Sequence, residues 1–440
     1  MALAESALLT GVRAFSCLEC GRCTAVCPVA RYQKFSPRRL ISRMLSGGLE
    51  GLSADVSLWA CLTCNRCQQV CPTGVDYDEF ILGLRNAAVR FSSRGDTGDE
   101  EIPAPAAAEN TAVKTGTEQK GAVHAPCSHG GVFEQVSRMM AREGLSQERM
   151  GWVTPDLKIH EDKGEDLLYI GCSPYFAAYF GGETADGLQS SLLSAVRLLN
   201  RAGITPTLLT NERCCGYHRR LAGEVTQAEA LEERVVAQIK ESGAKRVITI
   251  CPECLVALRD TFRRHGVATE VAHLSELLAP RAESLKAKPD GGSAVTYHDP
   301  CRLGRYARIF DAPRQLLKKV AGSELHEMNN IRERSICCGN TAWLHCNAAT
   351  RALQLARIEE GAATGSDTMI TACPACYIHL RCAQEGLSED APAAGIRIVD
   401  LWTHLASAVD AAPASSPTTA AATSGGGGAG KSRKRRKTSK

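Results

Sequence analysis

The chain has 440 residues, 44% of them hydrophobic, and a formal net charge of +4. This length allows two or three domains with their own cores, and the composition excludes a small disulfide-stapled scaffold. Seven Lys or Arg side chains and no acid lie within residues 431–440, which leaves −3 for the rest of the chain. The body therefore lacks the general basic footprint of a nucleic-acid-binding protein, and we expect no nucleic-acid partner.

Cysteine is the unusual residue, with 21 copies. The first twenty residues have neither a basic stretch nor a sustained apolar core of the kind that a secretory signal needs. No apolar run reaches the roughly 20 residues of a membrane-spanning helix. We therefore expect a cytoplasmic protein, in which disulfides are disfavoured and cysteines serve metal or redox chemistry.

The N-terminal part, residues 1–92, predicts a small α-rich domain. Ser36 is a candidate cap with Pro37 at the first helical position, and the pair Gly47-Gly48 is a candidate stop for this helix. Residues 93–164 begin with a polar stretch rich in Ala, Pro, Thr and Gly that has no apolar periodicity. We expect a flexible linker there, followed by a connecting helix.

From residue 165 onward, short apolar runs alternate with longer amphipathic ones, which is typical of a parallel sheet covered by helices. Aligning "VITICPECLVALR" with "MITACPACYIHLR" reveals an internal repeat, and we expect its copies at 165–290 and 291–408. The fold class is therefore α+β overall, an α-rich domain followed by a duplicated α/β domain. Residues 409–440 predict a disordered basic tail.

Eight cysteines form two copies of the motif C-x2-C-x2-C-x3-C-P, which is the bacterial ferredoxin run. The fourth cysteine of each run is expected to reach the neighbouring cluster, so the two predicted 4Fe–4S cubanes share their ligands in a crossed way. One set is Cys17, Cys20, Cys23 and Cys71, and the other is Cys61, Cys64, Cys67 and Cys27. Zinc, the alternative, prefers two separated C-x2-C pairs.

Ten further cysteines fall into two sets of five, one in each repeat. Most of them follow a predicted strand, and the carboxyl ends of parallel strands converge on the crevice where ligands bind. We therefore expect the five thiols of each set to meet. The first set is Cys172, Cys214, Cys215, Cys251 and Cys254, and the second is Cys301, Cys337, Cys338, Cys373 and Cys376.

The residues beside these cysteines suit an anionic metal site. Pro252 and Pro374 predict that the C-x-x-C cysteines begin helices, where free amides favour thiolates. Gly216 and Gly339 permit the backbone reversal that turns a doubled cysteine toward one site. Five ligands exceed the four that a cubane or zinc uses, which suggests a bridged or noncubane cluster.

The two five-cysteine sets resemble the CCG domain in the B subunit of heterodisulfide reductase, and residues 10–90 resemble its C subunit. The fused order resembles the D subunit of the same family. The sequence around these cysteines is also similar to the iron–sulfur subunits of anaerobic glycerol-3-phosphate dehydrogenase and of glycolate oxidase. The resemblance implies one or two noncubane iron–sulfur clusters at which a disulfide is reductively cleaved, with Cys214, Cys215, Cys337 and Cys338 at the reacting site.

We therefore expect an iron–sulfur oxidoreductase subunit that passes electrons through two cubanes to noncubane clusters, for disulfide reduction or dithiol oxidation. The alternative is a pure electron relay between a flavin or cytochrome partner and the quinone pool. No flavin or nicotinamide fingerprint is present. A partner is expected to supply the other redox centre, as a membrane b-type cytochrome, a flavoprotein or another iron–sulfur protein.

Other residues are ambiguous. His298 and His218 could donate a hydrogen bond or a proton at the clusters, or serve the structure only. Arg302 and Arg305 could attract an anionic substrate, but solvated surface arginines are the expectation. Cys127, Cys346 and Cys382 fall outside every motif and are expected to be unremarkable. The basic tail could hold the protein at the inner face of the cell membrane through anionic lipid headgroups.

Overall fold

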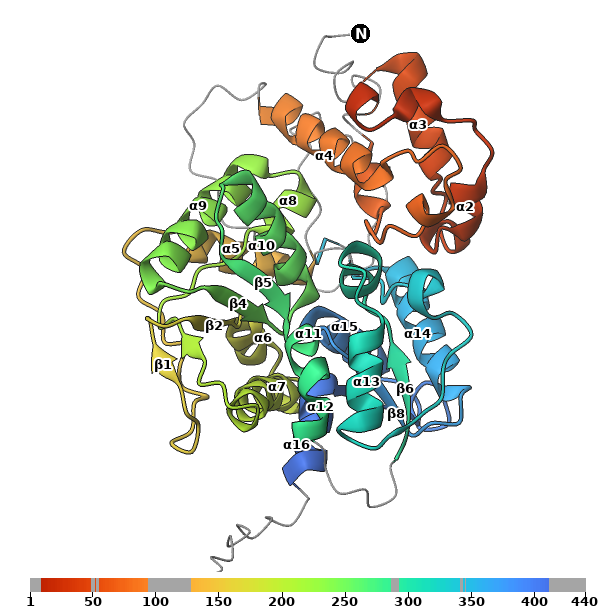
Figure 1. The fold of residues 1–440 in the computed structure, drawn as a ribbon. Helices are drawn as coiled ribbons and strands as arrows, with labels where there is room; N and C mark the ends of the chain where they lie inside the picture. Colours follow the sequence, from red (N-terminus) through yellow and green to blue (C-terminus); the bar gives the residue numbers. More distant parts are fainter. Residues whose placement is uncertain are drawn as a thin grey trace, which may run out of the picture.

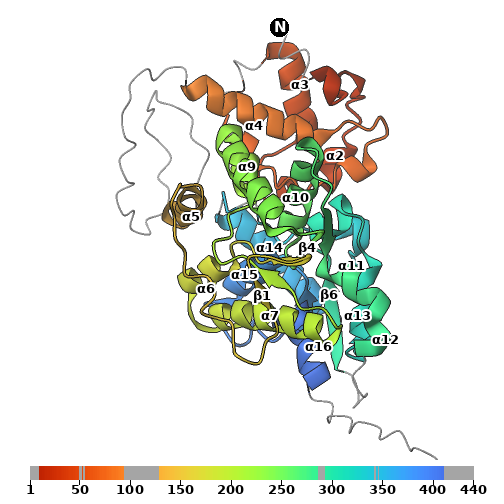
Figure 2. The ribbon, with the colours of Figure 1, turned by 60° about the vertical axis from the view of Figure 1, so that its left-hand side comes forward.

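The computed structural model describes residues 9–48, 52, 55–93, 128–285, 293–340, 343–344 and 346–410. The N-terminal segment lies at one end of the molecule, and two sheet-containing halves form the rest (Figures 1 and 2). No described helix has both the length and the apolar character that a membrane crossing requires. The predicted linker up to residue 127 and the predicted tail after residue 410 lie outside the described residues.

The N-terminal segment is helical, with short turns around the cysteines. Its α-helices are α2 (Arg22–Val26), α3 (Pro37–Gly47) and α4 (Tyr77–Ser93), and its 3-10 turns are η1 (Ala14–Ser16), η2 (Val29–Arg31), η3 (Val56–Ala60) and η4 (Gln68–Val70). The predicted start of α3 is confirmed, because the Ser36 side chain accepts from the backbone N–H of Arg39. Gly48 ends this helix with a φ of 68°.

The first sheet is wholly parallel, with strand order β1-β3-β2-β4-β5. Its central pair runs in register from Asp166 beside Arg246 to Tyr169 beside Thr249. The strands are β1 (His160–Glu161), β2 (Asp166–Tyr169), β3 (Thr207–Leu208), β4 (Arg246–Thr249) and β5 (Glu270–His273). The helices of this half are α5 (Val132–Met140), α6 (Ser173–Phe180), α7 (Gly182–Arg201), α8 (Tyr217–Ala222), α9 (Val225–Ser242), α10 (Pro252–Arg264), α11 (Leu274–Leu278) and α12 (Ala282–Leu285).

The second sheet is also parallel, with strand order β7-β6-β8-β9. The order matches β3-β2-β4-β5 of the first sheet, so the described strands repeat one topology and β1 is an addition at the edge. The strands are β6 (Ala294–His298), β7 (Glu324–Leu325), β8 (Thr368–Thr371) and β9 (Arg397–Asp400). The helices are the π-helical turn η7 (Arg302–Tyr306), α13 (Asp311–Lys319), α14 (Ala348–Ala362), α15 (Pro374–Gln384) and α16 (Leu401–Asp410).

The two halves share one core. Helix α7 of the first half packs against α16 of the second, and α11 packs against α13. Buried apolar side chains of both sheets and of the N-terminal segment form a single contiguous cluster. The mixed fold class predicted from the sequence is confirmed, with helices covering two parallel sheets (Figure 1).

The N-terminal segment is fixed to the first half by buried hydrogen bonds. Arg85 of α4 donates to the carbonyls of Leu58 at 3.0 Å, Cys61 at 2.7 Å and Leu221 at 2.8 Å. Trp59, fully buried, donates from Nε1 to the carbonyl of Ala222 at 3.1 Å. These donors satisfy carbonyls at the end of α8, so they link the segment and the sheet domain while compensating desolvation.

Gly223 makes this contact possible. Its φ is 92°, and a Cβ there would lie 2.6 Å from the carbonyl carbon of Arg85. Gly243 also ends a helix with a positive φ, of 72°, but a Cβ there would meet nothing within 4 Å. We expect Gly243→Ala to cost about 1 kcal/mol from backbone strain alone, and Gly223→Ala to cost about 3 kcal/mol because the α4 backbone must also move.

Urea unfolding of both variants measures this difference, and hydrogen exchange of α4 locates it. Equal losses of stability in the two variants would contradict the close contact with Arg85.

Candidate metal centres

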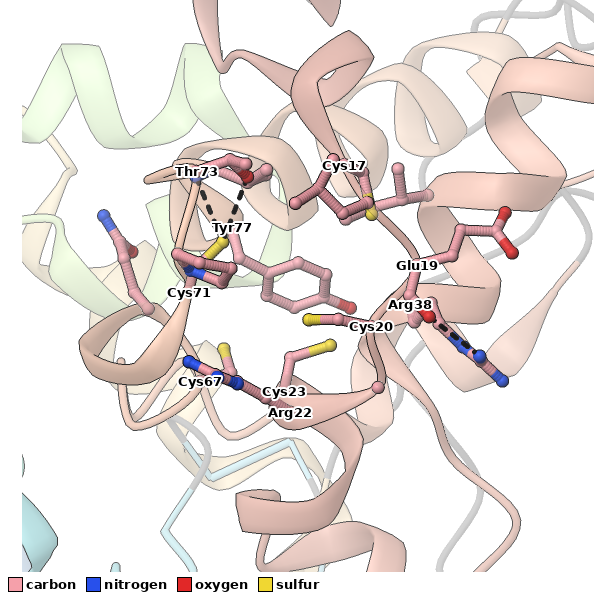
Figure 3. Close-up of a pocket in the computed structure, with 16 residues that line it drawn as sticks. Cys17, Glu19, Cys20, Arg22, Cys23, Arg38, Cys67, Cys71, Thr73 and Tyr77 are labelled. Carbon is pink, nitrogen blue, oxygen red and sulfur yellow. Dashed lines mark hydrogen bonds between the residues drawn. The ribbon is translucent and has the colours of Figure 1, made fainter.

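The first cavity lies in the N-terminal segment and holds about 450 Å³. Cys17, Cys20, Cys23 and Cys71 line it, and Figure 3 shows them around the ring of Tyr77. These are the four cysteines that the sequence assigns to one cubane. Partial burial opposes ionisation of Cys71, but hydrogen bonds from Thr73 and from backbone amides, including Val75 N–H at 3.4 Å, lower the pKa of this thiol below its ordinary value. Such a thiol suits a thiolate ligand.

The second cavity, of about 370 Å³, is lined by Cys27, Cys61, Cys64 and Cys67. They are the four cysteines assigned to the other cubane, and Cys67 also reaches the first cavity. Burial raises the pKa of Cys27 to about 12, and the nearby Cys64 and Cys61 add to this; burial raises the pKa of Cys61 to about 11. Thiols so crowded ionise when a metal cation shares the site, so the donor set fits an iron–sulfur cluster.

The first five-cysteine set meets at one cavity of about 400 Å³, which all five cysteines line. Cys172 is the residue before α6, and Cys251 is the residue before α10, whose first residue is Pro252 as predicted. The Sγ atoms of Cys172 and Cys214 are 3.8 Å apart, and those of Cys215 and Cys254 are 3.7 Å apart. Distances of this size suit sulfurs that bind neighbouring metal atoms rather than a disulfide.

The doubled cysteine depends on the glycine that follows it. Gly216 has a φ of 75°, and a Cβ there would lie 2.9 Å from the carbonyl oxygen of Ala228 in α9. The reversal that the sequence predicts at Gly216 is therefore present, and the close helix backbone excludes a side chain there. Gly339 plays the same part in the second repeat, with a φ of 89°.

The second five-cysteine set also gathers at the strand ends. The Sγ atoms of Cys376 and Cys338 are 3.3 Å apart. Hydrogen bonds from Cys337 and Cys376 lower the pKa of Cys338 to about 5, while the thiol of Cys301, hydrogen-bonded to Cys337 and buried, has a pKa well above its ordinary value. The thiols of this set therefore differ in their pKa before any metal binds.

His298 faces this second set. One of its ring nitrogens, Cys338 Sγ and Cys376 Sγ lie within 4.8 Å of one another. Its Nδ1 accepts from Arg357 Nε at 3.0 Å, and its buried Nε2 has no partner among the described residues. Burial, reinforced by the Arg357 cation, lowers the pKa of His298 to about 3, so the imidazole is neutral with its proton on Nε2. The imidazole therefore offers an unpaired N–H in the neighbourhood of the thiols.

The first set has a different neighbour, the pair His218 and Glu253. His218 Nε2 lies 3.0 Å from Glu253 Oε2, both side chains are nearly buried, and both line the cavity with Phe176 and Tyr217. The second repeat has Ala375 where the first has Glu253. Glu253 was not predicted from the sequence, although its position inside C-P-E-C is a signal that could have indicated it.

A buried ion pair, which was also not predicted from the sequence, supports the first five-cysteine set. Glu212 accepts from the backbone N–H groups of Gly171 at 2.6 Å and Ile170 at 3.0 Å, and Arg149 lies 3.3 Å away. Arg149 also donates to the carbonyl of Gly171 at 2.5 Å. Burial raises the pKa of Glu212 to about 7 against the lowering effect of Arg149. Together these contacts fix the turn that carries Cys172.

Arg302 and Arg305 are buried, so the expectation of solvated surface arginines is wrong. Arg302 donates to the carbonyl and hydroxyl of Thr63, and Arg305 donates from Nε to the carbonyl of Cys64 at 2.6 Å. Arg305 also reaches the carbonyl of Ser335 at 2.8 Å, just before the second doubled cysteine. The chain buries these cations because backbone carbonyls of the N-terminal segment satisfy them.

These contacts set the order of the four sites. Arg305 bridges Cys64 of the second cavity, whose carbonyl it binds, and Ser335, which lies two residues before the doubled cysteine of the second five-cysteine set. Pro374, next to Cys373, lines the cavity of the first five-cysteine set. The second cavity therefore adjoins the second set, and the second set adjoins the first.

Two of the three remaining cysteines are described, and neither joins a site. Cys346 is exposed and Cys382 is half-buried. Cys127 lies outside the described residues.

Family models match three segments of the chain. Residues 13–75 match the 4Fe–4S dicluster domain, and residues 170–259 and 295–381 match the cysteine-rich CCG domain. The chain combines a 4Fe–4S dicluster domain with two CCG domains. Eighteen cysteines of the two kinds of motif thus account for its unusual composition, and the prediction of an iron–sulfur protein is confirmed.

The relatives of the chain are redox proteins. The D subunit of heterodisulfide reductase from Methanosarcina mazei is 32% identical over 56% of this chain and 60% of its own length. The probable iron–sulfur-binding oxidoreductase FadF of Bacillus subtilis is 26% identical over 83% of this chain and 56% of its own. EtfAB:quinone oxidoreductase of Syntrophomonas wolfei is 32% identical over 48% of this chain and 30% of its own length. The predicted likeness to the D subunit of heterodisulfide reductase is confirmed, and the chain spans about 60% of that relative.

One solved structure resembles the whole described fold. A hypothetical protein from Helicobacter pylori covers 93% of this chain and 73% of its own, with a TM-score of 0.50 and 10% identity. At this identity the likeness concerns the fold alone.

The buried position of Arg302 predicts a local loss of structure on substitution. Arg302→Met removes the donors to Thr63, and we expect a cost of about 3 kcal/mol with faster hydrogen exchange in residues 56–64. Arg308→Met is the control, because Arg308 binds Gln69 at 3.0 Å across the same interface but is exposed, and we expect less than about 0.5 kcal/mol. Urea unfolding and exchange measure both variants, and similar effects would contradict a buried bridge at Arg302.

Proposed function

We propose that the chain is an iron–sulfur subunit of an electron-transfer complex that reduces a disulfide, or oxidises two thiols, at its CCG sites. When bound, two cubane and one or two noncubane iron–sulfur clusters would supply single-electron transfer and an iron atom that accepts a thiolate. Reduction of a disulfide consumes two electrons and two protons and yields two thiols. The observation that carries the proposal is the cavity of the first CCG site, which five thiols and an acid–base pair line together.

Shared cavities support the ligand sets of the two cubanes and of the first CCG site, and the short distance between Cys376 and Cys338 supports that of the second CCG site. We assign Cys17, Cys20, Cys23 and Cys71 to one cubane and Cys27, Cys61, Cys64 and Cys67 to the other, and each five-cysteine set to a noncubane cluster. The adjacency of the sites supports electron passage from the first cubane to the second, then to the second CCG site and finally to the first.

The residues of the first CCG site suit a small thiol or disulfide. Phe176 and Tyr217 give its cavity apolar walls that exclude water, and Pro374 closes it from the second repeat. Glu253 fixes Nε2 of the His218 ring, and both side chains line the cavity beside the thiols. At the second site, His298 is placed to donate a hydrogen bond to sulfur, which stabilises a negatively charged cluster.

A second candidate function is a pure relay to the quinone pool. The likeness to EtfAB:quinone oxidoreductase favours it. In both cases we propose that a partner supplies the other redox centre, as a b-type cytochrome, a flavoprotein or another iron–sulfur protein.

The crossed ligand assignment has a testable consequence. Cys71→Ser is expected to disturb the same cluster as Cys17→Ser, although the two residues come from different motifs, and Cys27→Ser is expected to disturb the other one. Mössbauer and EPR spectra of the reduced variants separate the two clusters. If Cys71→Ser and Cys27→Ser changed the spectrum of the same cluster, the assignment would be contradicted.

The two candidate functions differ in what a dithiol does to the oxidised protein. With anaerobically purified, fully loaded protein, disulfide chemistry predicts a new EPR signal on adding a dithiol, because thiolate binds an open iron. We expect Cys172→Ser, in the first CCG site, to abolish this signal and Cys301→Ser, in the second, to retain it. If the EPR spectrum did not change at full cluster occupancy, disulfide chemistry would be excluded and the relay function would remain.

A further inference from the structure

The surface beside the first cavity is strongly basic. Residues 9–48, all of them described, contain seven cations and a single acid, Glu19, for a formal net charge of +6. Six of these cations are exposed and Arg38 is half-buried. We call them the basic face: Arg13, Arg22, Arg31, Lys34, Arg38, Arg39 and Arg43.

Little within the described chain neutralises the basic face. Of its seven cations, only Arg43 forms an ion pair with a described carboxylate, that of Asp55. Arg31, Lys34, Arg38 and Arg39, together with Arg43, line one open groove of about 1310 Å³ beside α3. Like charges gathered in one groove repel one another and raise the local potential by several kT, so the face favours an anionic partner.

The basic face borders the place where electrons can enter or leave. Of the eighteen motif cysteines, all described, Cys20 is the only exposed one, and it lines the first cavity with Glu19, Arg22 and Arg38 (Figure 3). Phe15 and Leu18, beside it, are 56% and 68% exposed. Exposed apolar side chains close to cations in the sequence suit a protein-binding surface.

We propose that the basic face docks a small acidic electron-carrier protein against the first cubane site. The charge supplies steering and orientation, and Phe15 and Leu18 supply the apolar contact at the centre. A groove accommodates a protruding acidic loop, whereas a flat plane of lipid headgroups meets only its rims. The electron passes singly from the reduced carrier, which is oxidised, to the first cubane site, or in reverse.

Binding of a small acidic ferredoxin to the full, cluster-loaded chain tests this proposal. The dissociation constant is measured by calorimetry between about 20 and 300 mM salt. We expect affinity to fall at least about tenfold over this range, and the triple variant Arg31→Glu, Lys34→Glu, Arg39→Glu to weaken low-salt binding by a similar factor.

The matched control is Lys163→Glu, Lys240→Glu, Lys318→Glu, which makes the same change in net charge at exposed cations outside the N-terminal segment. It is expected to stay within about twofold of the parent chain. Iron content and unfolding temperature report whether each variant is intact. Equal weakening by both triple variants, or binding that ignores salt, would overturn the proposal.

Vesicles rich in phosphatidylserine separate a lipid surface from a protein partner. We expect the parent chain to bind the ferredoxin more tightly than the vesicles. Vesicle binding that the basic-face variant loses, without any ferredoxin binding, would overturn the acidic-protein assignment in favour of a membrane. None of these outcomes depends on thiol chemistry at the CCG sites, so the docking proposal and the proposed function can fail separately.

Discussion

The buried guanidinium of Arg302 is the contact on which the order of the metal sites depends. It begins the π-helical turn directly after Cys301 and binds Thr63, between Cys61 and Cys64 of the N-terminal segment. Tyr306 adds its hydroxyl to the same carbonyl at 2.7 Å. A cation held by carbonyls and a hydroxyl keeps its full charge, which would partly offset the negative charge of thiolates at the two neighbouring sites. With the contacts of Arg305, Arg85 and Trp59, it fixes the distance between the dicluster domain and the CCG domains, and electron transfer between them requires a fixed distance.

The duplicated CCG domains keep the cysteines and change what surrounds them. In the second repeat His298 faces the thiols, while the equivalent strand position in the first is Tyr169, which donates to the carbonyl of Arg213 at 2.5 Å. In the first repeat Glu253 and His218 line a cavity, while the second has Ala375 in place of Glu253. Two sites with the same ligands and different neighbours are expected to differ in potential and in access. This asymmetry favours different roles for the two sites. We propose that the second site transfers electrons and that the first site binds a reactant.

The first cavity is the exposed end of the proposed electron path. Cys20 there is exposed, whereas each later site contains buried cysteines, which are Cys61 and Cys64 at the second cavity and the doubled cysteines at both CCG sites. Burial lowers the effective dielectric and strengthens every charge near a cluster, so the inner sites respond more strongly to a single donor such as His298. The basic face lies beside the first cavity, at the exposed end of the proposed electron path. There the surface has to recognise a partner rather than exclude water.

Sequence reasoning was sufficient for the features of this protein whose physics is local. Spacing of two or three residues decides which thiols can surround one metal, proline decides where α10 and α15 begin, and glycine after each doubled cysteine decides the chain reversal. The alternation of apolar runs predicted two parallel sheets, and their strand ends predicted the meeting place of each five-cysteine set. Long-range packing was needed to show that Arg302 and Arg305 are buried, that Glu212 and Arg149 brace Cys172, and that Glu253 faces His218. These contacts join residues from 35 to 241 positions apart, and no periodicity marks them, because a charged side chain reads the same in sequence whether water or a distant carbonyl satisfies it.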